Sequence, residues 1–142
     1  MSERNIELTR RHLEAYNARD ADALVSYCDP NIEFHPLLPG ALGGAAYRGH
    51  DGMRRWLGEL AEASVAEMRV EVEAFFDLGE QILVFGALRG RGRSSGAEVT
   101  MPSVVVFRWR DGLVVYLKGY ADREDALRDL YVSEDELERI AP

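Results

Sequence analysis

The stretch MRVEVEAFF at residues 68–76 alternates apolar and charged side chains, and it opens the part of the chain that decides the fold. Three more segments of the same character follow after short turns: ILVFGALRGRG at 82–92, VTMPSVVVFRWR at 99–110 and LVVYLKGY at 113–120. The last two are joined by Asp111-Gly112, a dipeptide typical of tight hairpins. A period of two indicates strands, so this half of the chain is predicted to be an antiparallel meander of four strands.

Helical periodicity marks the chain on either side of the meander. Apolar residues three and four positions apart predict a helix over 3–19, a short helix around 23–25, and a third helix entered near residue 50. After the meander, one helix is predicted to begin at Asp122 and a last short one to cover 134–140. NIEFHP at 31–36 is predicted to be a short strand, and the stretch 37–49, rich in Gly, Pro and Ala, an irregular loop that rims a binding site.

These elements limit the architecture. A twisted meander with one apolar face must cover that face, and the three N-terminal helices are available to do so. We therefore expect an α+β fold, in which a curved antiparallel sheet wraps around three N-terminal helices as a cone-shaped barrel with a pocket. Residues 1–142 are expected to form one domain, because this length suits a single core.

Composition excludes several classes of partner. The chain has 17 Lys and Arg against 25 Asp and Glu, a formal net charge of -8, so nucleic acid and anionic membrane surfaces are not expected partners. No apolar run is long enough for a membrane helix, and the N-terminal residues lack the apolar stretch of a secretory signal. The single cysteine, Cys28, cannot form an internal disulfide and is expected to be a small buried side chain without chemistry. A cytoplasmic location is the expectation.

Three segments carry a resemblance to a known family: AYNARDADAL at 15–24, YRGHDGMRRWL at 47–57 and GYADREDAL at 119–127. With the order of elements, they resemble the SnoaL-like branch of the nuclear-transport-factor-two-like superfamily, over residues 5–131. Its relatives include ketosteroid isomerases, polyketide ester cyclases, scytalone dehydratase and limonene epoxide hydrolase, besides pure binding or dimerisation domains. The resemblance implies a pocket for a small hydrophobic molecule and, where there is catalysis, acid/base chemistry that needs no cofactor.

The same resemblance implies four candidate catalytic residues. His35, directly before Pro36, occupies the position of the isomerases' basic aspartate, and Asp122 occupies that of the cyclases' base. His12 falls where the isomerases have an oxyanion-donating tyrosine, and Tyr16 lies one helical turn away. Each has a plainer interpretation.

The plainer interpretation of His35 is a solvent-facing strand residue, and that of Asp122 is a helix N-cap. His12 is expected at the surface or a boundary, because it lies about one position off the apolar stripe of Leu13 and Tyr16. Tyr16 is on that stripe, so core packing with its hydroxyl at the cavity edge is the preferred interpretation.

Aromatic residues are the candidates for binding the small molecule, although each taken singly is more often a core residue. They are Trp56, Phe76, Phe85, Phe107 and Tyr120. The three histidines show no spacing typical of metal ligands, so no metal site is predicted.

Three functions stay open at this point. The chain is an acid/base enzyme (a cyclase, isomerase, dehydratase or hydrolase), a non-catalytic binder of small molecules, or a dimerisation module. A cavity that holds both His35 and Asp122 would favour the enzyme. A cavity lined only by apolar groups would favour the binder, and a cone filled by its own side chains would favour the dimerisation module. The apolar runs at 104–107 and 113–117 also predict a homodimer through the outer face of the meander.

Overall fold

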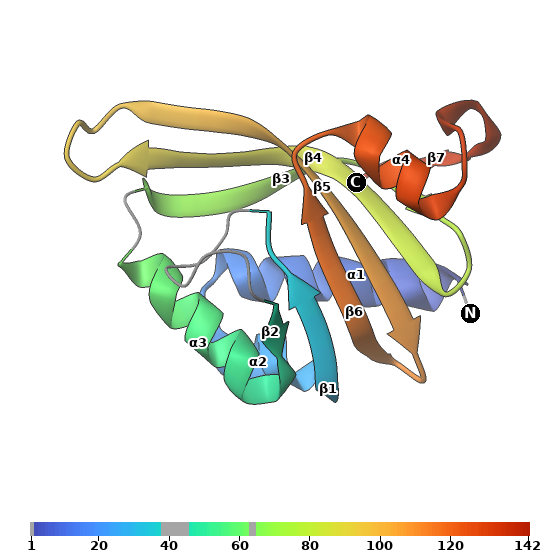
Figure 1. Ribbon diagram of the computed structural model, residues 1–142, viewed down its shortest axis with the longest axis horizontal. Coiled ribbons are helices and arrows are strands. Elements are labelled where there is room, and N and C mark those ends of the chain that lie inside the picture. The colour runs from blue at the N-terminus through green and yellow to red at the C-terminus, as the bar shows by residue number, and fades with distance from the viewer. Residues whose placement is uncertain (1, 38–45, 63–64) are drawn as a thin grey trace.

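The sheet of the computed structural model is strongly curved, and most of its helices lie on its inner side (Figure 1). The structure describes residues 2–37, 46–62 and 65–142. Within these residues, seven strands form one sheet in the order β2-β1-β6-β5-β4-β3-β7. The strands are β1 (Cys28–His35), β2 (Tyr47–Arg48), β3 (Val65–Asp77), β4 (Gln81–Gly92), β5 (Glu98–Arg110), β6 (Leu113–Tyr120) and β7 (Arg139–Ile140). The predicted meander is confirmed as β3 to β6, and β1 joins it parallel to β6.

The helices divide between the two faces of the sheet. They are α1 (Ser2–Asn17), α2 (Ala21–Ser26), α3 (Gly49–Ala61) and α4 (Arg123–Leu130), with a 3-10 turn, η1, at Glu134–Glu136. Figure 1 shows α1, α2 and α3 on the concave side and α4 on the other. The predicted α+β architecture, a curved sheet around three N-terminal helices, is therefore confirmed. The side chain of Asp20 caps α2 and that of Asp122 caps α4, so both helices begin directly after an aspartate that acts as N-cap.

Two predictions of local structure are wrong. Tyr47–Arg48, inside the predicted loop, forms β2 and pairs with β1; residues 38–45 of that loop lie outside the described residues. The predicted helix over 134–140 is instead η1 followed by β7, which pairs with β3 at Phe75–Phe76. An open strand edge offers backbone hydrogen bonds that outweigh the weak helical signal of a short polar segment.

The apolar run at 104–107 is buried because the sheet has a core on each side. Val104 and Val106 belong to an outer core that α4 covers with Ala126. Phe107 belongs to the inner core beneath α1 and α3, and Val105 packs against it. Burial on both faces thus explains this apolar run without a second chain, and the homodimer stays a prediction.

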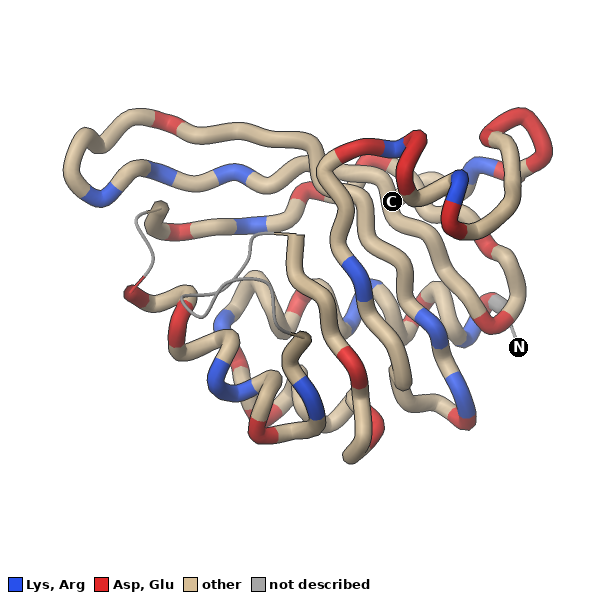
Figure 2. The backbone as a smooth tube through the Cα atoms, viewed as in Figure 1, with Lys and Arg blue, Asp and Glu red and all other residues tan. Residues whose placement is uncertain are grey.

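Charge is spread over the outside of the molecule, and acidic residues gather around α4 and the segment that follows it (Figure 2). None of the helices in the described ranges is long and apolar enough to cross a membrane.

Buried and partly buried hydrogen bonds hold α1 across the concave face at two points. The indole Nε1 of Trp109 on β5 donates to Thr9 Oγ1 over 2.9 Å, and the Thr9 hydroxyl donates to the Asn5 carbonyl at 2.7 Å. Two turns further on, the Asn17 amide donates to the carbonyl of Val70 and accepts from its N–H, at 3.0 and 2.9 Å. The helix is thus fixed to β5 and to β3, and the residues between its two anchors take fixed positions above the sheet.

Thr9→Val should lower the free energy of unfolding by about 1–3 kcal/mol, because it leaves the buried indole N–H of Trp109 without an acceptor at almost unchanged volume. Urea unfolding measures the loss. In a Trp109→Phe background the same change should cost much less, since no donor remains. Equal costs in the two backgrounds would show that the hydrogen bond does not anchor α1.

Candidate functional site

A partly open cavity lies between the concave face of the sheet and the helices. Its empty space, counted with the solvent at its mouth, is about 610 Å³. The helices supply His12, Leu13, Tyr16, Trp56 and Leu60 to its wall. Apart from His12, Tyr16 and Ser103, the described lining is apolar, so most of what a bound molecule would contact here is hydrocarbon.

Strand alternation selects the rest of the wall. On β5 the residues Ser103, Val105 and Phe107 line the cavity, while the residues between them turn to the outer core. On β6, Gly119 also lines it, at a point where a Cβ atom would lie 2.7 Å from the backbone nitrogen of Leu37. Only glycine therefore lets the segment after β1 lie this close to β6, where it forms part of the cavity wall.

His12 is the one imidazole in this wall. Its side chain is buried, with the residue 3% exposed, and its ring meets Phe107 edge-on at 5.1 Å between centroids. Nε2 lies 3.9 Å from the Sγ atom of Cys28, whereas Nδ1 is enclosed and has no hydrogen-bond partner among the described residues. Burial lowers the pKa of His12 from 6.5 to about 4, so the ring is neutral at pH 7.

The expectation that His12 lies at the surface or a boundary is wrong. Thr9, His12, Leu13 and Tyr16 occupy positions i, i+3, i+4 and i+7 of α1, and all four are buried. The buried stripe is wide enough to include His12, and counting it from Thr9 instead of Leu13 would have revealed this.

Aromatic stacking forms another wall of the cavity. The ring of Tyr16 stacks on Trp56 at 5.4 Å between centroids, and Trp56 meets Phe34 edge-on at 4.6 Å. Burial raises the pKa of the Tyr16 phenol. The Arg19 guanidinium lies 4.5 Å from the centroid of the Tyr16 ring and donates to the carbonyls of Tyr16 and Met68. Of the predicted aromatic residues, Trp56, Phe107 and Tyr16 therefore do line the cavity.

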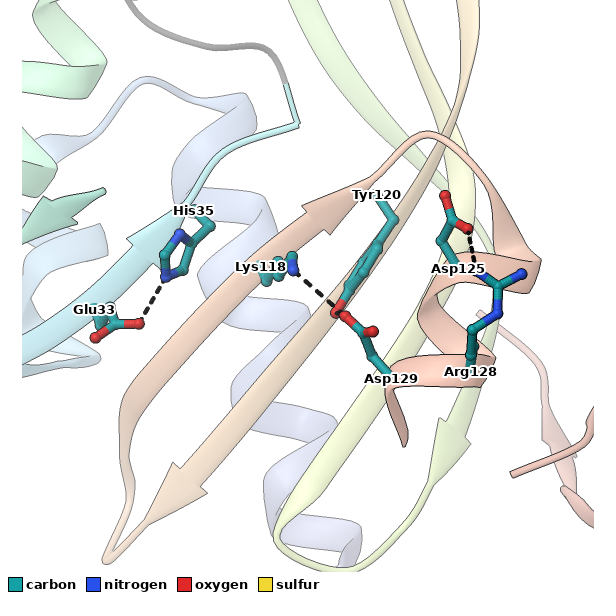
Figure 3. A network of polar contacts seen from close by, with 7 residues as sticks. All are labelled: Glu33, His35, Lys118, Tyr120, Asp125, Arg128 and Asp129. Carbon is teal, nitrogen blue, oxygen red and sulfur yellow. Dashed lines mark hydrogen bonds and ion pairs between the residues drawn. The ribbon is translucent and has the colours of Figure 1, made fainter. Parts of the chain in front are cut away.

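His35 does not line the cavity. Phe34 faces the cavity, so the next residue on β1 faces outward, and Figure 3 shows His35 beside Glu33 on the outer side of the sheet. His35 Nε2 lies 2.6 Å from the Glu33 carboxylate, which also accepts from Arg48 at 3.1 Å. The hydrogen bond from His35 is the main reason that the pKa of Glu33 is lowered. This pair is a half-exposed surface interaction.

Asp122 does not line the cavity either. Its carboxylate accepts a hydrogen bond of 2.7 Å from the backbone N–H of Glu124, as an N-cap does, at the start of α4 on the far side of the sheet. The expectation that His35 or Asp122 faces a cavity touched by Trp56 or Tyr16 is therefore wrong for both residues.

Three predicted binding residues also belong to the other face. Phe76 and Phe85 meet edge-on at 4.8 Å inside the outer core, and Tyr120 packs against the same core. The hydroxyl of Tyr120 donates to Asp129 of α4 at 2.6 Å (Figure 3). Burial, followed by this bond to a carboxylate, raises the pKa of Tyr120. These side chains attach α4 to the sheet and do not face the cavity.

Cys28 lies behind His12 and is buried, as expected. Its thiol donates to the carbonyl of Leu24 at 3.4 Å, and burial raises its pKa to about 12, so it is not a thiolate near neutrality. Over the described part of the chain, no three His, Cys, Asp or Glu side chains are grouped so that they could hold a metal ion.

A curved sheet that encloses an apolar cavity with its N-terminal helices defines the nuclear-transport-factor-two-like class of fold. The chain belongs to the SnoaL-like domain family, whose model matches residues 9–117. No curated protein has significant sequence similarity to it.

Solved structures of the same class agree with this assignment. A protein of unknown function from Burkholderia pseudomallei, of the same class, is 26% identical with a TM-score of 0.74, and the match covers 88% of this chain and 95% of that one. TerC, co-crystallised with polyporic acid, is 24% identical with a TM-score of 0.73, covering 89% and 97%. A candidate SnoaL-like polyketide cyclase from Jannaschia sp. CCS1 is 20% identical with a TM-score of 0.72, covering 89% and 90%.

The buried His12 should make stability depend on pH. Its pKa is 6.5 when unfolded and about 4 when folded, so the unfolded chain binds the proton more readily, and stability falls as the pH drops from about 6.5 towards 4. Between pH 7 and pH 5 the wild type should lose about 2 kcal/mol more than His12→Phe, which has no proton to bind. Urea unfolding at the two pH values measures this difference, and equal losses would place the folded-state pKa of His12 near its ordinary value.

Proposed function

We propose that this domain binds a small, largely apolar molecule in the cavity. The observation that carries the proposal is an apolar cavity whose wall includes a buried, neutral histidine with an unpartnered nitrogen. Apolar walls supply affinity by removing hydrocarbon surface from water, and a few polar atoms orient the bound molecule. The co-crystallisation of TerC with polyporic acid is consistent with small-molecule binding in this fold.

Binding is favoured over the acid/base enzyme first expected. That expectation required His35 and Asp122 in the cavity. Instead, His35 is bonded to Glu33 on the outer side of the sheet, and Asp122 caps the start of α4. A pure dimerisation module was expected to have a cone filled by its own side chains. The described side chains of this domain instead surround a cavity, which favours binding.

Filling the cavity should abolish binding. Val105→Phe places a larger side chain in the wall, and Thr100→Phe makes the same kind of change on an exposed part of β5 outside the cavity. An uncharged fluorescent probe such as N-phenyl-1-naphthylamine should bind the wild type and Thr100→Phe alike, and Val105→Phe at least about tenfold more weakly, a loss of about 1.4 kcal/mol or more. Failure of the wild type to bind this and similar apolar probes, or equal binding by all three proteins, would refute the proposal.

A second function, proton transfer by His12, has its own support. The imidazole is neutral at neutral pH, so it is able to accept a proton, and it lies in an apolar cavity where a substrate would contact it. With His35 and Asp122 outside the cavity, a cofactor-free cyclase, isomerase, dehydratase or hydrolase activity would have to use His12 as its base.

For such an activity, the rate should be nearly constant from about pH 5.5 upward, because a base with a pKa of about 4 is already deprotonated there. His12→Phe should lose about 100- to 10,000-fold in kcat, measured on ring-bearing ketones and esters. A rate that rises with an apparent pKa near 6.5, or that survives His12→Phe, would exclude His12 as the base.

A further inference from the structure

We propose that Ser103 selects the ligand of the cavity by donating a hydrogen bond from its hydroxyl to a carbonyl oxygen on an otherwise apolar molecule. This inference rests on the proposed binding function, and it specifies the polar contact and the chemical class of the ligand. Ser103 lies on β5, where the next two residues of the cavity wall, Val105 and Phe107, are apolar.

The hydroxyl of Ser103 has no partner in the described part of the chain. Ser103 is 4% exposed, and its side chain makes no hydrogen bond with residues 2–37, 46–62 or 65–142. Among these residues, Nδ1 of His12 is the one side-chain polar atom that both lacks a partner and is enclosed. The unpartnered Ser103 hydroxyl is therefore not enclosed, and since Ser103 lines the cavity, a molecule bound there can reach it.

The neighbouring strand leaves this hydroxyl uncovered. Ser103 pairs with Gly86 of β4, the position from which a cross-strand side chain would contact it. A Cβ atom at residue 86 would collide with the carbonyl oxygen of Glu71 on β3, so only glycine fits there. The sheet itself thus excludes a directly opposite side chain that would compete with a ligand for the Ser103 hydroxyl.

The two other polar side chains of the described lining, His12 and Tyr16, already have neighbours. Nδ1 of His12 is enclosed, and Nε2 lies 3.9 Å from the sulfur of Cys28. The phenol of Tyr16 interacts with the Arg19 guanidinium, which opposes the rise in its pKa caused by burial. Ser103 is therefore the described lining residue whose polar group is both accessible and without an interaction partner.

The chemistry of the serine hydroxyl determines the class of ligand. Its hydrogen needs an acceptor, and the hydrocarbon of the surrounding wall provides none. A carbonyl oxygen accepts this hydrogen and adds no hydrogen of its own. A ligand hydroxyl would also accept, but its own hydrogen would then need a further acceptor in a wall that is mostly apolar. Ketones, aldehydes and esters on an apolar body therefore suit this contact.

Two ligands of nearly the same shape isolate the contact, because 2-acetylnaphthalene has a carbonyl oxygen where 2-isopropenylnaphthalene has a methylene group. Their binding at pH 7 is measured by displacement of N-phenyl-1-naphthylamine. Ser103→Ala should weaken the binding of 2-acetylnaphthalene about 3- to 10-fold and should not weaken that of 2-isopropenylnaphthalene. Thr100→Val removes an exposed hydroxyl from the same strand outside the cavity, and it should bind both ligands as the wild type does.

Two further measurements distinguish contact with the ligand from a structural role of Ser103. The carbonyl carbon-13 resonance of bound 2-acetylnaphthalene should lie further downfield in the wild type than in Ser103→Ala, because a hydrogen bond withdraws electron density from that carbon. Without ligand, Ser103→Ala should have a urea midpoint at or above that of the wild type, since the hydroxyl that it removes has no partner. A lower midpoint would show that this hydroxyl is bonded within the protein and would overturn the inference.

The outcomes distinguish the two proposals. Failure of N-phenyl-1-naphthylamine and of both ligands to bind refutes the proposed function itself. Binding of N-phenyl-1-naphthylamine without 2-acetylnaphthalene leaves the proposed function standing and overturns the ligand class. Equal effects of Ser103→Ala on the two ligands overturn the role of Ser103. So does a selective loss of 2-acetylnaphthalene binding in Tyr16→Phe but not in Ser103→Ala, which would assign the contact to the other hydroxyl of the wall.

Discussion

The hydrogen bond from Trp109 to Thr9 is the interaction on which the site depends. It joins the middle of α1 to β5 inside the core, and the paired bonds of Asn17 with Val70 join the C-terminal end of the helix to β3. His12 and Tyr16 lie between these anchors, so the polar contacts on either side of them, together with the packing of His12 on Phe107, set their height above the sheet. A helix held in this way bridges the curved sheet, and the space it spans is the cavity.

The alternation of the strands then assigns every side chain to one of two environments. Successive residues of β5 face the cavity and the outer core in turn. In the apolar run 104–107, Val105 and Phe107 therefore line the cavity, whereas Val104 and Val106 pack in the outer core. The same rule separates Phe34 from His35 on β1 and Gly119 from Tyr120 on β6. The polar pairs of the outer face, His35 with Glu33 and Tyr120 with Asp129, are structural consequences of this assignment.

Local signals in the sequence were enough for most of the elements, but not for β2, β7 or the site. The hairpin at Asp111-Gly112 and the caps Asp20 and Asp122 each act within a few residues, and each was predictable. Which face of the meander surrounds a cavity depends on helices distant in sequence, and both faces are apolar, so Phe76, Phe85 and Tyr120 could not be distinguished from Phe107. β7 was missed because its partner is the distant β3. His12 was the exception, since the i, i+3, i+4, i+7 pattern from Thr9 already marked it as buried.

The chemistry of the cavity follows from what its burial excludes. A carboxylate there would lack a counter-charge, and a protonated histidine would too, which is why the imidazole of His12 is neutral. Within a wall of this kind, apolar contact supplies affinity for many molecules and discriminates poorly between them. A single buried acceptor discriminates strongly, because a molecule that fails to satisfy it leaves its cost in the complex. Among the described lining residues, His12, Tyr16 and Ser103 carry the polar groups on which such discrimination would depend.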